Sequence, residues 1–166
     1  MDPFQFLIYI IRPSLDYLRL GGVAAEKLLL GTALHESGGL RYIQQLNGPA
    51  VGIYQMEPDT YYDLCKSIVK GKYYEKILGY APRTICPIYA ATKEGFPPPH
   101  AYLRVNNQWA TVMARMFYYR VKAPLPPHND IDGLAAYYKK YWNTPKGKAR
   151  VVDFIAALEP HLGNWA

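Results

Sequence analysis

One run of apolar residues constrains the fold more than any other part of the sequence. Spacings of three and four, the period of one α-helical face, separate Trp109, Val112, Met113, Met116 and Phe117. A face this apolar has to be buried, so we predict that the segment is the central core helix. A chain of 166 residues, half of them apolar, is long enough to enclose one core. We therefore expect a single domain over residues 1–166.

The other periodic segments are also predicted to be helical. Val23 to Ser37 carries a helical stripe, and Gly38-Gly39 directly after it is a typical helix end. Capping residues and apolar spacing predict further helices over 60–71, 73–78, 130–142 and 152–156. The stretch 38–58 is too rich in glycine and asparagine for a helix. The predicted fold class is mainly α, a helical single domain with a small loop or β-hairpin region near residues 38–58.

The N-terminal segment, Met1 to Ile11, is apolar from Phe4 onwards. It lacks the basic region and the small-residue cleavage site of a signal peptide. We expect Arg12-Pro13 to end the segment far short of a membrane span. The segment is therefore interpreted as a helix that packs on the core.

The formal net charge of +6 favours an anionic partner, which leaves nucleic acid, a membrane face and an anionic cell wall open. No helix-turn-helix spacing or RNA-recognition motif supports a nucleic-acid-binding protein, and DNA binding with a steep salt dependence would be needed to restore that hypothesis. Cys65 and Cys86 lack the spacing of a zinc site and are too few for a disulfide scaffold, so we expect both to be reduced. We expect no metal and no cofactor.

Glu36 is the strongest candidate for chemistry. A glycosidic bond breaks when its leaving oxygen is protonated, which requires a carboxylic acid that keeps its proton near neutral pH. Glu36 falls in the last turn of the predicted helix 23–37, where the negative end of the helix and the apolar neighbours both raise the pKa of its carboxyl. The sixteen tyrosines favour a groove lined by rings with one polar end, which suits sugars. An isolated glutamate near a helix end is otherwise an ordinary solvated residue.

Three blocks occur in order along the chain: Glu36-Ser37, then Gly52-Ile53-Tyr54-Gln55-Met56-Glu57-Pro58-Asp59-Thr60, then Leu134-Ala135-Ala136-Tyr137. Over residues 24–142 this pattern resembles the soluble lytic transglycosylase and goose-type lysozyme superfamily. In that family a Glu-Ser pair ends a helix, a Gly-x-x-Gln-x-x-Pro-x-Thr segment follows, and the tyrosine of an Ala-Ala-Tyr-Asn motif lies near the catalytic acid. The resemblance implies an α+β lysozyme-like fold and a peptidoglycan muramidase that cleaves the MurNAc-GlcNAc β-1,4 bond.

The resemblance also implies roles for individual residues. Glu36 is the acid/base, Ser37 orients the substrate or the acid, and Tyr137 forms a hydrogen bond near Glu36. Gln55 and the Gly52 backbone line the sugar groove, whereas Pro58 and Thr60 are structural. Aromatic rings stack on sugar faces, so Tyr54 or Tyr42 is also expected in the groove. The family's asparagine and Ala-Gly are replaced by Tyr138 and Lys139-Lys140, which puts sugar contacts from that loop in doubt.

The reaction depends on whether a second carboxylate is present. Hydrolases of this chemistry use two carboxylates, whereas lytic transglycosylases use one acid, because a hydroxyl of the substrate attacks to form a 1,6-anhydro sugar. Glu57 stands at a normally apolar family position, and Asp59 is explained by helix capping. The sequence therefore favours the single-acid route slightly, with a hydrolytic lysozyme as the alternative. His35 points about a hundred degrees around the helix from Glu36 and is interpreted as a surface or packing residue.

Other classes and settings remain open at this stage. A non-catalytic phage virion or cell-wall-binding protein with the same fold is the second hypothesis. The basic positions Lys139, Lys140, Lys146, Lys148 and Arg150 could hold an anionic wall or membrane surface nearby, or could simply be solvated. The resemblance implies a phage endolysin or virion-associated lysin, made in the host cytoplasm without a signal peptide and acting on the cell wall from the periplasm or the virion. The expected partner is the peptidoglycan glycan strand, bound by a monomer, with no nucleic acid.

Overall fold

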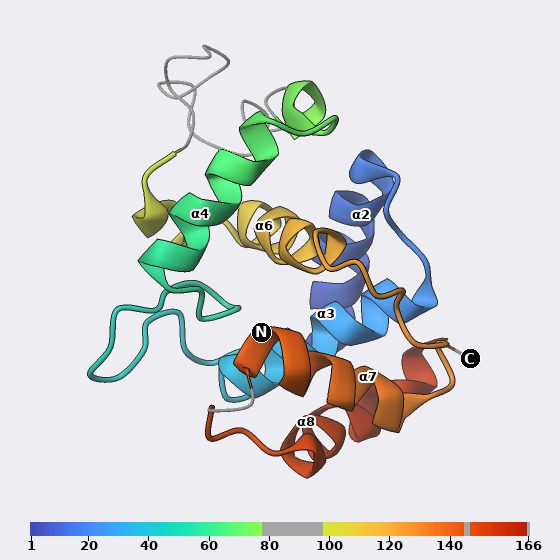
Figure 1. The fold of residues 1–166 in the computed structure, drawn as a ribbon. Helices are drawn as coiled ribbons and strands as arrows, with labels where there is room; N and C mark the ends of the chain where they lie inside the picture. The colour runs from blue at the N-terminus through green and yellow to red at the C-terminus, as the bar shows by residue number, and fades with distance from the viewer. Residues whose placement is uncertain (78–97, 145–146, 166) are drawn as a thin grey trace.

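The computed structural model describes residues 1–77, 98–144 and 147–165, and these residues are mainly helical (Figure 1). The N-terminal half contains α1 (Pro3–Phe6), a π-helical turn η1 (Leu7–Ile11), α2 (Arg12–Leu18), α3 (Val23–Glu36) and α4 (Pro58–Val69). Residues 74–77 are also helical. The C-terminal half contains the 3-10 helix η4 (His100–Arg104), α6 (Asn107–Tyr119), α7 (Ile131–Tyr138), the π-helical turn η5 (Lys139–Asn143), α8 (Val151–Leu158) and the 3-10 helix η6 (Glu159–Trp165).

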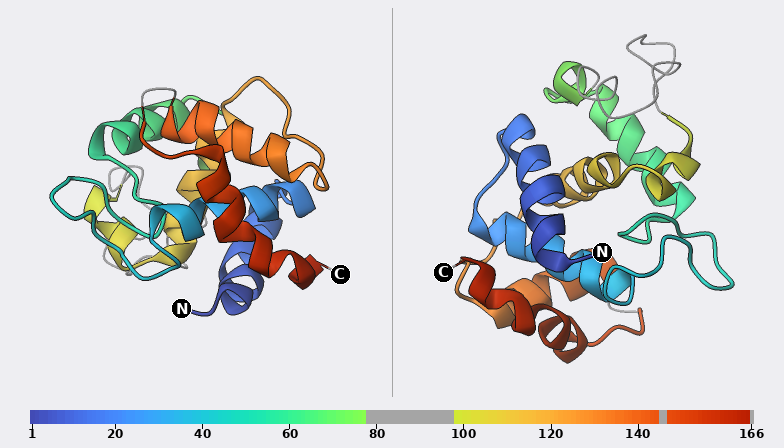
Figure 2. Two further views of the ribbon diagram at one scale, coloured as in Figure 1. Left: turned by 90° about the horizontal axis from the view of Figure 1, so that it is seen from below. Right: turned by 180° about the vertical axis from the view of Figure 1, so that it is seen from behind.

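Two helices form the centre of the molecule. Every residue of α6 from Trp109 to Tyr118 is buried, which agrees with the predicted core helix. Helix α3 is buried on all sides from Lys27 to Leu34 and lies between the N-terminal helices with α6 on one side and α7 with α8 on the other (Figures 1 and 2). One continuous apolar cluster extends from Phe6 to Leu158. The core therefore has two central helices, where the sequence predicted one.

The N-terminal segment packs on this core, because Phe6, Leu7 and Ile11 are fully buried. The prediction that Arg12-Pro13 ends the segment is wrong, since the helix continues through Pro13 to Leu18. Proline has no N–H to donate, and the wider π-helical turn before it accommodates this, with the Arg12 N–H bonded to the Leu7 carbonyl. No helix within the described ranges is long and apolar enough to cross a membrane.

The end of α3 agrees with the prediction, whereas the start of α4 does not. Helix α3 ends at Glu36 as expected, and Gly38 and Gly39 adopt φ values of 60° and 80°. Helix α4 begins at Pro58 with Glu57 at its N-cap, so Thr60 does not cap it. Proline is favoured in the first turn because its missing N–H has no partner there in any helix.

The segment between α3 and α4 is an irregular loop that folds back on itself. Its only regular pairings among the described residues are isolated antiparallel bridges, in which Val51 pairs with both Gln44 and Met56. Gly52 has a φ of 78°, and a β-carbon there would lie 2.5 Å from the Leu103 carbonyl oxygen. Buried side chains, including Ile53 and Met56, attach the loop to the core. The predicted loop or hairpin region is thus an irregular loop, in which residues 50–54 and 56 are buried against the core and residues 41–47 are exposed.

Candidate active site

The Glu36 side chain lies at the end of α3, partly buried, in a cleft of about 540 Å³. Burial is the largest influence on its carboxyl and raises the pKa to about 7, while a hydrogen bond from Tyr138 acts in the opposite direction. The Tyr138 hydroxyl donates this bond to Glu36 Oε1 over 2.6 Å. Near neutral pH a large fraction of Glu36 therefore carries a proton.

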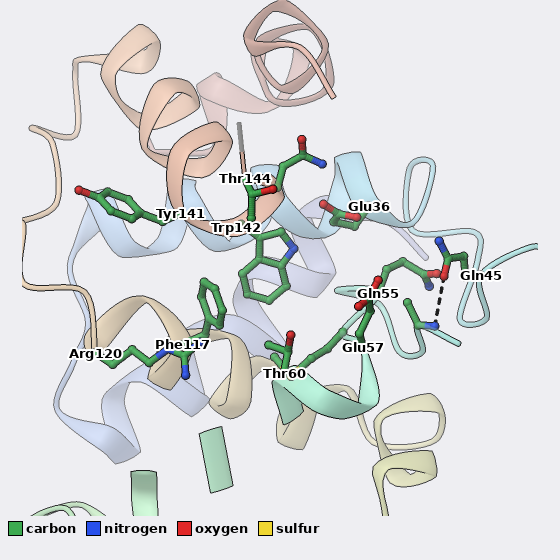
Figure 3. Close-up of a pocket in the computed structure, with 13 residues that line it drawn as sticks. Glu36, Gln45, Gln55, Glu57, Thr60, Phe117, Arg120, Tyr141, Trp142 and Thr144 are labelled. Carbon is green, nitrogen blue, oxygen red and sulfur yellow. Dashed lines mark hydrogen bonds between the residues drawn. The ribbon is translucent and has the colours of Figure 1, made fainter. Parts of the chain in front are cut away.

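Polar and aromatic groups occupy different parts of the cleft (Figure 3). Glu36, Gln55 and Glu57 gather at one end, beside Gln45 and Thr60. Aromatic residues and an arginine form the other end: Phe117, Tyr141 and Arg120. Trp142 lies between the two groups in the view of Figure 3. The volume is in the range of sites that bind small molecules.

Tyr138, rather than Tyr137, is the tyrosine that contacts Glu36. Tyr138 is fully buried, its ring stacks on Phe154 at 4.9 Å, and burial raises the pKa of its hydroxyl, which therefore stays protonated as a donor. Tyr137 instead donates to the Ala123 carbonyl over 2.9 Å. The expectation for Tyr137 is thus wrong by one residue. Consecutive side chains on a helix point about a hundred degrees apart, so only one of the two can face α3.

Ser37 does not reach the cleft. It is completely buried, its hydroxyl donates to the Ala33 carbonyl over 2.6 Å, and it accepts the Leu40 N–H over 2.8 Å. Its hydroxyl thus acts as both a donor and an acceptor at the end of α3. Ser37 therefore stabilises the turn after Glu36 and does not contact a substrate in the cleft. Of the two roles that the resemblance implied, orientation of the substrate is wrong, and orientation of the acid stays a prediction.

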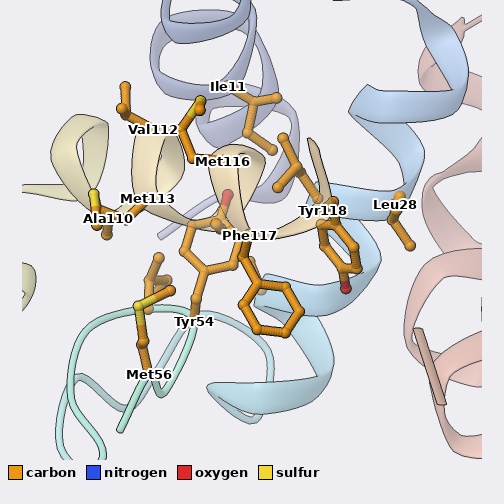
Figure 4. Close-up of a cluster of buried hydrophobic side chains, with 14 of the residues drawn as sticks. Ile11, Leu28, Tyr54, Met56, Ala110, Val112, Met113, Met116, Phe117 and Tyr118 are labelled. Carbon is orange, nitrogen blue, oxygen red and sulfur yellow. The ribbon is translucent and has the colours of Figure 1, made fainter. Parts of the chain in front are cut away.

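Tyr54 is a core residue. Only 1% of it is exposed, and its hydroxyl lies 3.1 Å from Thr111 Oγ1. Figure 4 shows its ring among apolar side chains, next to Phe117 and above Met56. The expectation that Tyr54 lines the groove is therefore wrong. Tyr42, the alternative, is half exposed but does not line the cleft.

Of the two predicted groove residues Gly52 and Gln55, only Gln55 lines the cleft. Gly52 is buried and does not line the cleft, so its backbone is not available to a sugar there, and its conformation serves the turn. Gln55 does line the cleft together with Glu36. Gln55 Nε2 donates to the Gly52 carbonyl over 2.8 Å, which fixes the side chain and leaves its carbonyl oxygen for other partners.

Sequence reasoning misses most of the residues that line the cleft, including its three aromatic residues. Trp142 lines the cleft, with its ring 4.7 Å from Phe117 and 5.3 Å from Tyr118. Phe117, a residue of the predicted core stripe, also lines the cleft. So do Thr60, for which the resemblance implies a structural role, and Glu57, which stands at a normally apolar family position. The signal for Trp142 in the sequence is a large ring at the end of the predicted helix 130–142, five positions after Tyr137.

The groups near the acid are otherwise structural. His35 packs edge-on against the Tyr138 ring at 5.3 Å, and burial lowers its pKa while Asp153 opposes this. Lys139 is occupied by Asn143 and the Gly147 carbonyl, and Arg150 pairs with Asp153. Lys140 lies over the Tyr141 ring at 5.1 Å, so three of the four predicted basic positions that the structure describes have local contacts, and Lys146 lies outside the described residues.

The cysteine that the structure describes, Cys65, does not line the cleft. Cys65 is buried and free, and burial raises the pKa of its thiol to about 12. Cys86 lies outside the described residues. No group of three or more potential metal ligands occurs in the part of the chain that the structure describes.

Fold and site together define a mainly helical protein with a glutamic acid of raised pKa in a cleft that is aromatic at one end and polar at the other. Comparison of the chain with protein-family models, with curated proteins and with solved structures found no match.

Proposed function

We propose that this protein cleaves the glycan strands of bacterial peptidoglycan, with Glu36 as the general acid. The observation that carries the proposal is the partly buried Glu36 carboxyl, whose pKa of about 7 lets it keep a proton at neutral pH. Such a proton can be delivered to a glycosidic oxygen as the bond to the sugar breaks. The lysozyme-like fold assignment belongs to this proposal and rests on the resemblance in the sequence.

The cleft supports a sugar substrate. Trp142, Tyr141 and Phe117 offer ring faces and edges to the apolar faces of sugars. Gln55, Gln45 and Asn143 add amide groups that can exchange hydrogen bonds with hydroxyl and acetamido substituents. These groups supply orientation, and Glu36 supplies the chemistry.

The first candidate reaction is transglycosylation, in which a hydroxyl of the substrate displaces the leaving sugar and forms a 1,6-anhydro end. Hydrolysis is the second candidate, because Glu57 brings a second carboxylate into the cleft of Glu36. Glu57 is exposed, and its side chain does not cap α4. A protonated acid and an ionised carboxylate facing one substrate are the two groups that hydrolysis needs.

Digestion of purified sacculi by wild type, Glu36→Gln and Glu57→Gln tests both candidates. We expect new chain ends from the wild type and a loss of at least about 100-fold in Glu36→Gln, because a general acid contributes at least that much. Mass spectrometry identifies anhydro ends as transglycosylation and reducing ends as hydrolysis.

Asp59→Asn is the matched control for Glu57, since Asp59 is an exposed acid on the same helical turn that does not line the cleft. Hydrolysis through Glu57 requires that Glu57→Gln loses the reducing ends while Asp59→Asn retains them. If the wild type generates no new ends, or Glu36→Gln generates as many as the wild type, the proposed function is wrong.

A further inference from the structure

A second, smaller hollow of about 190 Å³ lies next to the cleft, and we name it the side pocket. Its apolar wall contains Leu64, Ile68 and Met116, all of which are buried. Its rim contains exposed polar groups, among them Lys72, Tyr119 and Arg120. The proposed reaction makes no use of this pocket.

The side pocket and the cleft adjoin at Arg120, which lines both. Helices α4 and α6 contribute residues to both hollows. On α4, Thr60 lines the cleft and Leu64, one turn later, lines the side pocket. On α6, the neighbours Phe117 and Met116 face the cleft and the side pocket respectively. A branch on a sugar bound near Phe117 would therefore reach the side pocket by passing Arg120, the residue that lines both hollows.

The rim of the side pocket is positively charged. The Arg120 guanidinium lies over the Phe117 ring at 4.6 Å and donates to Asp63 over 2.8 Å. Asp63 is 71% exposed, and exposed ion pairs are weak, so Arg120 has capacity for a second carboxylate. Lys72 lies over the rings of Tyr73 and Tyr119 at 5.3 and 5.8 Å. None of the described lining residues is acidic.

We propose that the side pocket binds the peptide stem of the peptidoglycan strand held in the cleft. The stem branches from the muramic acid sugar and carries free carboxylates and alanine methyl groups. Arg120 and Lys72 bind the carboxylates, and Leu64, Ile68 and Met116 contact the methyl groups. This inference rests on the proposed function, because it takes the glycan in the cleft as the group from which the peptide branches.

Cleavage of two matched substrates tests whether the side pocket contributes to catalysis. Intact peptidoglycan is compared with glycan strands from which an amidase has removed the peptides. In the wild type we expect the intact substrate to be cleaved faster, with a lower KM. In Arg120→Gln and Lys72→Gln we expect the ratio of the two rates to fall about fivefold, as for the loss of one exposed charged contact. Lys66→Gln, an exposed lysine on α4 outside both hollows, should retain the wild-type ratio.

Binding of a synthetic stem pentapeptide, measured by NMR titration, tests the pocket independently of cleavage. We expect millimolar binding by the wild type with shifts at Tyr73 and Tyr119, weaker binding of an analogue whose carboxylates are amides, and weaker binding by Lys72→Gln. The inference is overturned if the pentapeptide and its amidated analogue bind equally, or if neither Lys72→Gln nor Arg120→Gln weakens binding of the pentapeptide. If the wild type cleaves neither substrate, the proposed function fails, and this titration still decides whether the pocket takes acidic peptides.

Discussion

At the scale of single residues, the Tyr138 hydroxyl tunes the proton on Glu36. Its hydrogen bond lowers the pKa of a carboxyl that burial raises to about 7. Removing the donor in Tyr138→Phe should move this pKa further upwards, because the ionised form loses a partner. Since the acid acts in its protonated form, activity should then persist to a higher pH than in the wild type. The pH profile of cleavage and the NMR titration of the Glu36 carboxyl both measure this shift.

Tyr137→Phe is the matched control, because the Tyr137 hydroxyl donates to the Ala123 carbonyl and not to Glu36. Tyr137→Phe should leave the pKa of the Glu36 carboxyl unchanged. An equal shift in both variants would mean that the effect comes from packing rather than from the hydrogen bond.

At the scale of elements, the close contact of α3 with α8 positions the tyrosine that holds the acid. Gly31 of α3 faces the Phe154 ring of α8, and a β-carbon at Gly31 would lie 2.3 Å from Phe154 Cζ. Phe154 also stacks against the ring of Tyr138. Gly31→Ala should therefore push Phe154 away and destabilise the protein by about 1–3 kcal/mol, although alanine favours helices. Urea denaturation measures the loss.

Gly163→Ala is the comparison, since no atom lies within 4 Å of a β-carbon added there. Its free energy of unfolding should stay near that of the wild type. A neutral Gly31→Ala would mean that α8 can move away from α3 without cost, and the account of how Tyr138 is positioned would then be wrong.

At the scale of the whole molecule, the raised pKa of Glu36 makes stability depend on pH. A carboxyl whose pKa rises from 4.5 in the unfolded chain to about 7 in the folded one opposes folding where it is ionised. The penalty is absent below about pH 4.5, grows as the pH rises, and is complete above about pH 7. Glu36→Gln should thus be more stable than the wild type by about 1–3 kcal/mol at pH 8 and equally stable at pH 4.

Urea denaturation at the two pH values measures this difference, with Glu57→Gln as the exposed control. A Glu36→Gln protein that is less stable than the wild type at pH 8 would contradict the raised pKa, because the buried carboxylate would then be a favourable group.

Local sequence determined much of the fold and the position of the acid. Helical spacing identified α6, the glycines after α3 placed Glu36 at a helix end, and the apolar residues of α3 indicated a raised pKa. These features depend on residues three or four positions apart, where the backbone fixes which side chains are neighbours. The resemblance of the segment Gly52–Thr60 to the family motif likewise implied a role for Gln55, which the loop carries into the cleft.

Only the tertiary structure decided which side chains meet at the acid. Tyr138 and Glu36 are 102 positions apart, and the rotation of α7 against α3 selects Tyr138 over its neighbour. The same packing buries Tyr54 and opens one edge of Trp142 to the cleft. The position of a residue in the sequence determines the direction in which its side chain points from its own helix. The angle at which two helices pack, however, depends on every side chain between them. For that reason the helices could be predicted from the sequence, whereas the walls of the cleft could not.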